Sequence, residues 1–142
     1  MKKMLLYFIS VVLILLITGF FIAGADRTNQ QNILFLQKFG WKISDQPIEC
    51  EEILLPEQFD QTYHTYNELQ LQIGMDLLPY RGKKCTRYTY LVLNYPKEVD
   101  EPVRANIICY RNKPIGGDIM TVSLAGFMHS LNFPIEENEL LR

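Results

Sequence analysis

The sequence predicts an α+β protein with a small antiparallel sheet of about four strands packed against two or three helices, behind an amino-terminal membrane helix. Three observations support this class. The first 25 residues are almost entirely apolar, later segments have helical periodicity, and the segments between residues 86 and 120 are rich in β-branched and aromatic residues. The expected order of elements is helix, strand, helix, three strands and a final helix, and this order argues for an antiparallel sheet packed against helices.

The amino-terminal segment has the length of a membrane span. No charged side chain occurs from Met4 to Ala25, where Leu, Ile, Val and Phe dominate. A helix of this length reaches about 33 Å, enough for a hydrocarbon core of about 30 Å. We therefore predict that residues 4–25 engage a bilayer, as a transmembrane anchor or as a signal peptide.

The flanking charges predict the orientation. Two lysines precede the apolar run, whereas Asp26 and Arg27 cancel one another after it. The positive end of a span stays in the cytoplasm, so residues 26–142 are expected to form a single extracytoplasmic domain behind the segment of residues 1–25. The run is longer than a typical secretory core, which favours a retained single-pass anchor. Ala23-Gly24-Ala25 also fits signal peptidase, so secretion after cleavage following Ala25 is the alternative.

Composition excludes some classes of function. Two of the 14 basic residues and none of the 16 acidic residues precede residue 26, so residues 26–142 have a net charge of −4. The sequence therefore lacks the basic stripe expected of a nucleic-acid binder or of a protein that relies on anionic lipid headgroups. Cys50, Cys85 and Cys109 lack the spacing of a zinc or redox motif and are interpreted as strand residues, with one disulfide and one free thiol as the alternative. No metal or cofactor is predicted.

Two helices are expected in the first half of the domain. Thr28 is expected to cap a helix that ends at Gly40, and an extended segment then runs from residue 41 to residue 54. The clearest helix follows between Pro56 and Gly74. Its large side chains recur at steps of four and three at Phe59, Tyr63, Tyr66, Gln70 and Ile73.

The second half of the domain is expected to supply most of the sheet. Residues 86–95 are predicted to form a strand that is covered on both faces, and residues 103–110 alternate as a second strand. Residues 111–113 are expected to turn into a final strand that contains residues 115–120. A short helix over residues 123–131 is expected to precede Pro134 and a polar tail.

The sequence contains no familiar catalytic motif. His64 and His129 lie in no motif, and there is no GxSxG, HExxH or glycine-rich phosphate loop. Gly116 and Gly117 are interpreted as a bulge or a close approach of two backbones, with Asp118 bonding a nearby amide. The alternative is a small extracytoplasmic hydrolase or transferase that uses Asp118 with a tyrosine or His129.

Binding is the leading functional hypothesis, because tyrosine and arginine combine apolar area with hydrogen-bond donors. A protein or cell-envelope partner is expected on a sheet face that carries Tyr88, Tyr90 and Arg104; burial of the tyrosines in the core is the competing interpretation. The candidate binding residues are Tyr66, Asn67, Arg87, Tyr88, Tyr90, Arg104, Asn106 and Asp118, and Asn94 belongs to the same polar and aromatic collection.

Several separated blocks resemble one family. They include TYNELQ, GMDL, RYTY, NYP and IGGD, within a similarity that covers most of residues 33–131. The chain resembles DUF4830, a family of small exported or membrane-anchored proteins of clostridia-like Gram-positive bacteria without an assigned activity. The resemblance implies one extracytoplasmic domain behind a hydrophobic segment, with IGGD and RYTY as hallmarks of the fold or site. Pro114 departs from the expected pattern, which places the local strand pairing in question.

Overall fold

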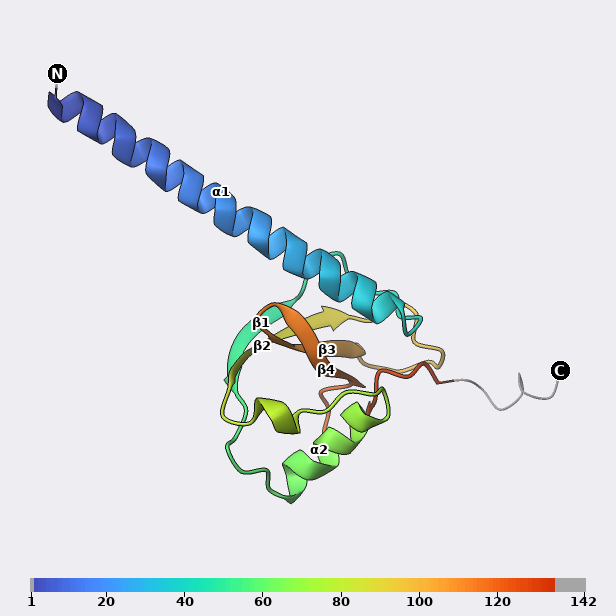
Figure 1. The fold of residues 1–142 in the computed structure, drawn as a ribbon. Coiled ribbons are helices and arrows are strands. Elements are labelled where there is room, and N and C mark those ends of the chain that lie inside the picture. Colours follow the sequence, from blue (N-terminus) through green and yellow to red (C-terminus); the bar gives the residue numbers. More distant parts are fainter. Residues whose placement is uncertain (1, 135–142) are drawn as a thin grey trace.

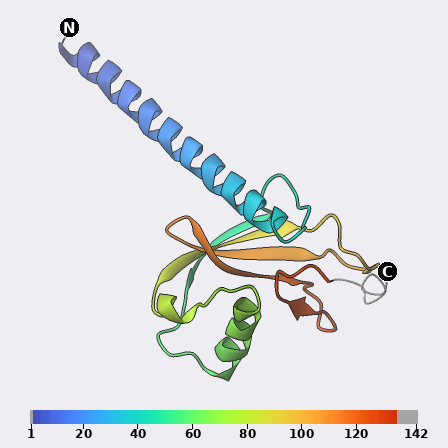
Figure 2. The ribbon, with the colours of Figure 1, turned by 45° about the vertical axis from the view of Figure 1, so that its right-hand side comes forward.

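A computed structural model of the chain describes residues 2–134, without the side chains of Lys2 and residues 21–23. A five-stranded sheet lies between a long helix on one face and a short helix on the other (Figures 1 and 2). The elements are α1 (Lys2–Gln37), β1 (Glu49–Leu54), α2 (Gln61–Leu71), the 3-10 helix η1 (Leu78–Tyr80), β2 (Lys84–Leu91), β3 (Arg104–Tyr110), β4 (Lys113–Met120) and β5 (Met128–His129).

The sheet has the order β1-β2-β3-β4-β5, and every neighbouring pair is antiparallel. The predicted α+β class is confirmed, with one strand more than expected. Successive side chains point to opposite faces of a strand, so the register decides which residues meet. Tyr90, Ala105 and Ile119 are register partners on the face that packs against α1, which we call the α1 face. Asn106 and Asp118 are partners on the opposite, α2 face.

Helix α1 has two different environments. Residues 3–20 are exposed, although nearly all of them are apolar. The helix is long and apolar enough to cross a membrane, and an amino-terminal signal sequence has the same properties. Its last turns instead pack on the sheet, where Thr28, Asn32 and Leu36 are buried at steps of four residues. The amino-terminal half of α1 is therefore apolar and exposed, whereas its last turns belong to the core of the domain.

The predicted start of a helix at Thr28 is wrong. Thr28 lies inside α1, and its Oγ1 donates to the carbonyl of Gly24 at 3.2 Å. Residues 25–28 include neither proline nor another strong helix breaker, so the helix continues from the apolar run. The predicted stop is confirmed, because Gly40 follows the last turn with a φ of 89°.

The α1 face carries the larger core. Trp41 is fully buried there, and its Nε1 donates to the carbonyl of Leu131 at 2.7 Å. Tyr90 is also fully buried, where Asn32 donates to its hydroxyl at 3.2 Å and the hydroxyl donates to Asn29 at 2.9 Å. These bonds satisfy buried polar groups and hold α1 in one register on the sheet.

The α2 face carries a second core around Leu55, Leu77, Cys85, Ile108 and Ile115. Helix α2 begins after Asp60, whose side chain accepts a hydrogen bond from the amide of Tyr63 at 2.9 Å. The helix predicted around residues 59–73 is thus confirmed, although it begins later than its first apolar residue. Its stop is also confirmed, because Gly74 follows with a φ of 73°.

The helix predicted over residues 123–131 is wrong, because this segment forms a loop and β5. The Thr121 amide donates to the carbonyl of Phe127 at 3.1 Å, and the Phe127 amide donates to the Thr121 hydroxyl at 3.1 Å, which closes the loop. Glu101 accepts from the amide of Ser123 at 3.0 Å, so a carboxylate from another loop satisfies the donor. The polar tail expected after Pro134 lies outside the described residues.

Candidate functional site

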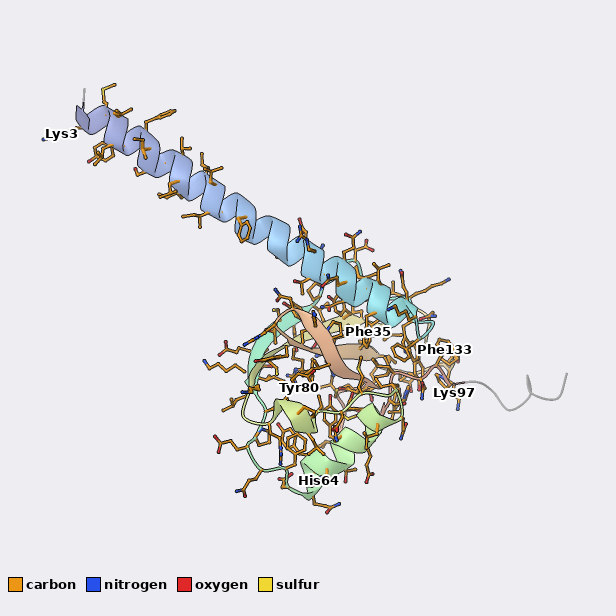
Figure 3. All side chains as sticks on the ribbon, in the orientation of Figure 1. Lys3, Phe35, His64, Tyr80, Lys97 and Phe133 are labelled. Atoms are coloured by element: carbon orange, nitrogen blue, oxygen red, sulfur yellow. The ribbon has the colours of Figure 1, made fainter. Side chains whose placement is uncertain are left out.

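A groove of about 730 Å³ lies between α2 and the α2 face of the sheet. Its walls are mostly apolar, with threonine and glutamine side chains along the helix side. The lining residues are Ile53, Leu55, Gln61, Thr62, Tyr63, Thr65, Tyr66, Leu69, Arg87, Asn106, Ile108, Asp118, Met120 and Met128. His64 lies between two lining residues in the sequence but is exposed on α2 outside the groove (Figure 3).

The floor of the groove contains a connected set of polar side chains from α2 and three strands. Asp118 accepts hydrogen bonds from the Tyr66 hydroxyl at 2.7 Å and from Nδ2 of Asn106 at 2.9 Å. Asn106 in turn accepts from the Thr89 hydroxyl at 2.7 Å. Asp118 is only 2% exposed, so its carboxyl group depends on these partners. We call Tyr66, Thr89, Asn106 and Asp118 the floor cluster.

Burial is the largest influence on the pKa values of Asp118 and Tyr66 in the floor cluster. It raises the pKa of Asp118, although the hydrogen bonds from Tyr66 and Asn106 and the charge of Arg87 act in the opposite direction. Burial and the nearby Asp118 carboxylate raise the pKa of Tyr66 well above its usual value. The Tyr66 hydroxyl therefore stays protonated and acts as a donor to Asp118.

The two glycines before Asp118 let α2 approach β4 closely. The amide of Gly117 donates to Oε1 of Gln70 at 2.7 Å, and a Cβ atom on Gly116 would lie 2.8 Å from the same oxygen. The register of β3 against β4 also shifts between Ile108 and Cys109, which is a bulge. The structural interpretation of the glycines is confirmed. Asp118 bonds the side-chain amide of Asn106 and the hydroxyl of Tyr66.

The strand pairing questioned at Pro114 does form. Pro114 lies within β4 opposite Cys109, just before the register shift. The neighbouring turn has positive φ values at Arg111 and Asn112, which is the type I′ geometry of a two-residue hairpin. The predicted turn is therefore confirmed without a glycine.

The rim of the groove carries exposed ion pairs. Arg87 donates to Glu51 at 2.6 Å, and Arg104 donates to Glu49 at 3.0 Å further along the same face. An exposed pair such as Arg87 with Glu51 contributes about 0–1 kcal/mol. Arg87 can therefore exchange its carboxylate partner at little cost in free energy.

The sequence candidates divide between several locations. Tyr66, Arg87, Asn106 and Asp118 come together at the groove. Asn67 is buried behind α2, where its side chain bonds Asp76 and the amide of Leu77. Asn94 bonds the carbonyl of Gly40 and the amide of Lys42, so it supports the end of α1.

The predicted surface of Tyr88, Tyr90 and Arg104 is wrong, because these side chains do not share a face. Tyr88 and Tyr90 pair with Ile107 and Ala105 on the α1 face, and Tyr90 has no exposed surface. Arg104 alternates with Ala105 and therefore lies on the α2 face. Side-chain alternation within one strand could not reveal this division, because it depends on the register between strands.

Sequence reasoning missed most of the apolar walls. Thr62, Tyr66 and Leu69 recur at steps of four and three on α2, a pattern that the aromatic stripe of the same helix obscured. Met128 was assigned to a helix, although it reaches the groove from β5 opposite Met120. The pairing of β5 with β4 has no short-range signal in the sequence.

The cysteines and histidines do not form a reactive cluster at the groove. All three cysteines are free and lie on β1, β2 and β3, which confirms their interpretation as strand residues. His129 pairs with Ile119 and thus faces away from the groove floor. Among residues 2–134, no group of three or more His, Cys, Asp or Glu side chains is arranged to hold a metal ion.

The fold and the groove define the class of protein. It is an α+β domain that follows a long apolar helix and has a groove between its short helix α2 and the sheet. Residues 35–119, more than half of the chain, match the family described as "Domain of unknown function (DUF4830)". The protein belongs to this family, and the resemblance seen in the sequence is confirmed. The matched span includes α2 and all of the floor cluster. No curated protein and no solved structure matches the chain.

Proposed function

We propose that this protein is a membrane-anchored, extracytoplasmic binding domain that holds an apolar segment of a cell-envelope partner protein in the groove. The observation that carries the proposal is a groove of about 730 Å³ with apolar walls around a hydrogen-bonded polar floor. Such a composition suits a ligand that buries apolar surface and aligns a few polar groups.

The groove walls favour a protein segment as the occupant. Met120 and Met128 lie on neighbouring strands, and methionine adapts its shape to varied apolar partners. Arg87 at the rim is held only by an exposed ion pair, so it is available to a carboxylate beside the apolar segment. An apolar segment with an adjacent acidic residue is therefore the proposed ligand chemistry.

The course of α1 supports retention of the anchor. Residues 23–25 lie within a helix that continues without interruption to Gln37. Thr28, Asn32 and Leu36 are buried where α1 packs on the sheet, so little chain is free to extend at Ala25. Retention places the domain directly at the membrane surface, on the outer side that the flanking charges favour.

A small extracytoplasmic hydrolase or transferase that uses Asp118 is the second candidate. It is favoured by the placement of Asp118 and Tyr66 at one groove, and by the raised pKa of the carboxyl group. The raised pKa of Tyr66 counts against a tyrosine nucleophile, and His129 faces away from the floor. Binding without catalysis is therefore the better account of the groove.

Site-specific photocrosslinking in cells tests the groove. A photoreactive phenylalanine at Thr65, which lines the groove, should capture one defined partner, whereas the same residue at His64 should not. Met128→Glu should abolish the capture, and Val122→Glu, a similarly exposed apolar site outside the groove, should leave it unchanged. Equal capture from positions 64 and 65, or capture that survives Met128→Glu, contradicts the proposal.

Cysteine labelling tests the location. Cys50 is exposed and the other two cysteines are buried, so the folded domain has one accessible thiol. A membrane-impermeant maleimide should label one thiol per chain in intact cells, and three after denaturation. Labelling that requires cell lysis would place the domain inside and refute the orientation. The mass of the amino terminus decides between anchor and cleavage, because cleavage predicts a chain that starts at Asp26.

A further inference from the structure

Two basic turns meet at one end of the sheet. The turn before β2 carries Arg81 and Lys83, and Lys84 begins β2. The β3–β4 hairpin carries Arg111 and Lys113, and all five side chains are exposed. The rings of Tyr80 and Tyr110 join the two turns, with their centroids 5.4 Å apart. We call these five cations the basic patch.

The basic patch is positive within an acidic domain. Glu52 pairs with Lys84 at 3.0 Å, and Glu57 lies beside Gly82 in the same turn. Five cations against two carboxylates leave three net positive charges, whereas residues 26–142 together have a net charge of −4. The patch is therefore a local reversal of sign that the total charge conceals.

The patch lies on the side of the domain toward which the amino-terminal half of α1 extends. Both ribbon views show the β3–β4 hairpin and the turn before β2 on this side (Figures 1 and 2). Only Asp26 and Arg27 separate the apolar run from Thr28, the first buried residue of the docked half. A bilayer around residues 4–25 would therefore lie next to the basic patch.

The hairpin presents its arginine in an unfavourable backbone conformation. Arg111 has a φ of 48°, in the left-handed region that glycine and asparagine occupy more readily. Its guanidinium lies 5.2 Å from the centroid of the Tyr110 ring, which supports a cation at the tip of the turn. Tyrosine rings are also common at membrane interfaces, where their two ends meet apolar and aqueous surroundings.

We propose that the basic patch contacts anionic phospholipid headgroups of the membrane that holds α1. The contact rests on the retained anchor and is independent of the occupant of the groove. Each basic side chain at an anionic surface strengthens the contact by roughly fivefold. With α1 as a tether, this contact holds the domain in one orientation and keeps the groove, on the far side of the sheet from α1, open to a partner.

Hydrogen exchange on the full chain in lipid nanodiscs tests the contact. Backbone amides of residues 110–113 should exchange more slowly in discs that contain phosphatidylglycerol than in discs of phosphatidylcholine alone. Arg111→Asn with Lys113→Gln should weaken the contact by on the order of 30-fold and remove the difference. Asparagine accepts the left-handed conformation, so the hairpin should persist in this variant. Lys38→Gln with Lys42→Gln, at the other end of α1, is the matched control.

High salt should also remove the difference, because screening weakens a contact between exposed charges. Equal exchange in both lipids, or an equal loss of protection in the Lys38 and Lys42 control, overturns the proposal. Protection by inorganic phosphate in neutral discs would identify a phosphate site and overturn it as well. Partner capture from Thr65 in the Arg111→Asn, Lys113→Gln variant reports on the groove separately, so either proposal can fail alone.

Discussion

The hydrogen bond between Tyr66 and Asp118 connects α2 to the sheet, and Tyr66→Phe removes it with little change in shape. The hydroxyl donates to Oδ2 of Asp118 at 2.7 Å, and the carboxyl group is 2% exposed. A hydrogen bond to a charged group contributes about 1.5–3 kcal/mol, and water has poor access to replace this one. We expect Tyr66→Phe to lower the free energy of unfolding by about 2 kcal/mol.

Trp41 makes this change measurable in the full chain. It is the one tryptophan of the protein, and it is fully buried against the ring of Phe133. Urea unfolding in detergent, followed by Trp41 fluorescence, therefore reports on the domain and not on the apolar half of α1. Tyr63→Phe is the control, because it removes the same atom from a ring at the same groove. The reasoning is refuted if both variants lose the same stability.

Two further predictions concern strand β4. Burial raises the pKa of Asp118 above its value of about 3.9 in unfolded chains, so its contribution to stability falls as the pH rises through the folded-state pKa. Asp118→Asn should therefore gain stability relative to wild type as the pH rises above about 4 in urea titrations, and a constant difference would contradict this. Gly117→Ala should cost about 3 kcal/mol in the same assay, because the new Cβ would collide with the carbonyl oxygen of Asn106. Gly24→Ala, with no atom within 4 Å, should cost nothing, and an equal loss in both variants would exclude the collision as the cause.

Local patterns were sufficient for most of the elements. The spacing around Tyr66 identified α2, and alternation in residues 103–110 identified β3. Gly40 and Gly74 marked helix ends because each adopts a positive φ that other residues avoid. The errors occurred where distant residues competed with a local preference. Ser123, for example, meets Glu101 instead of starting a helix.

The candidate site was predicted only in part. Tyr66, Arg87, Asn106 and Asp118 were recognised as residue types suited to binding, and the groove brings them together. Tyr90 was in the same set of candidate residues, but the strand register places its side chain in the core on the α1 face. Because one step along a strand reverses the face, a shift too small to read from sequence separates a site residue from a core residue.

The amino-acid sequence alone was enough to predict the apolar helix and the class of the fold, because these depend on composition and on periodicity within single segments, and its separated sequence blocks indicated the family that the match over residues 35–119 confirms. The groove, the floor cluster and the basic patch depend on contacts between segments far apart in the chain. Asp118 meets Tyr66 across 52 positions, and Tyr80 meets Tyr110 between two turns. Such contacts follow from strand register and from the packing of α2, which no single segment specifies.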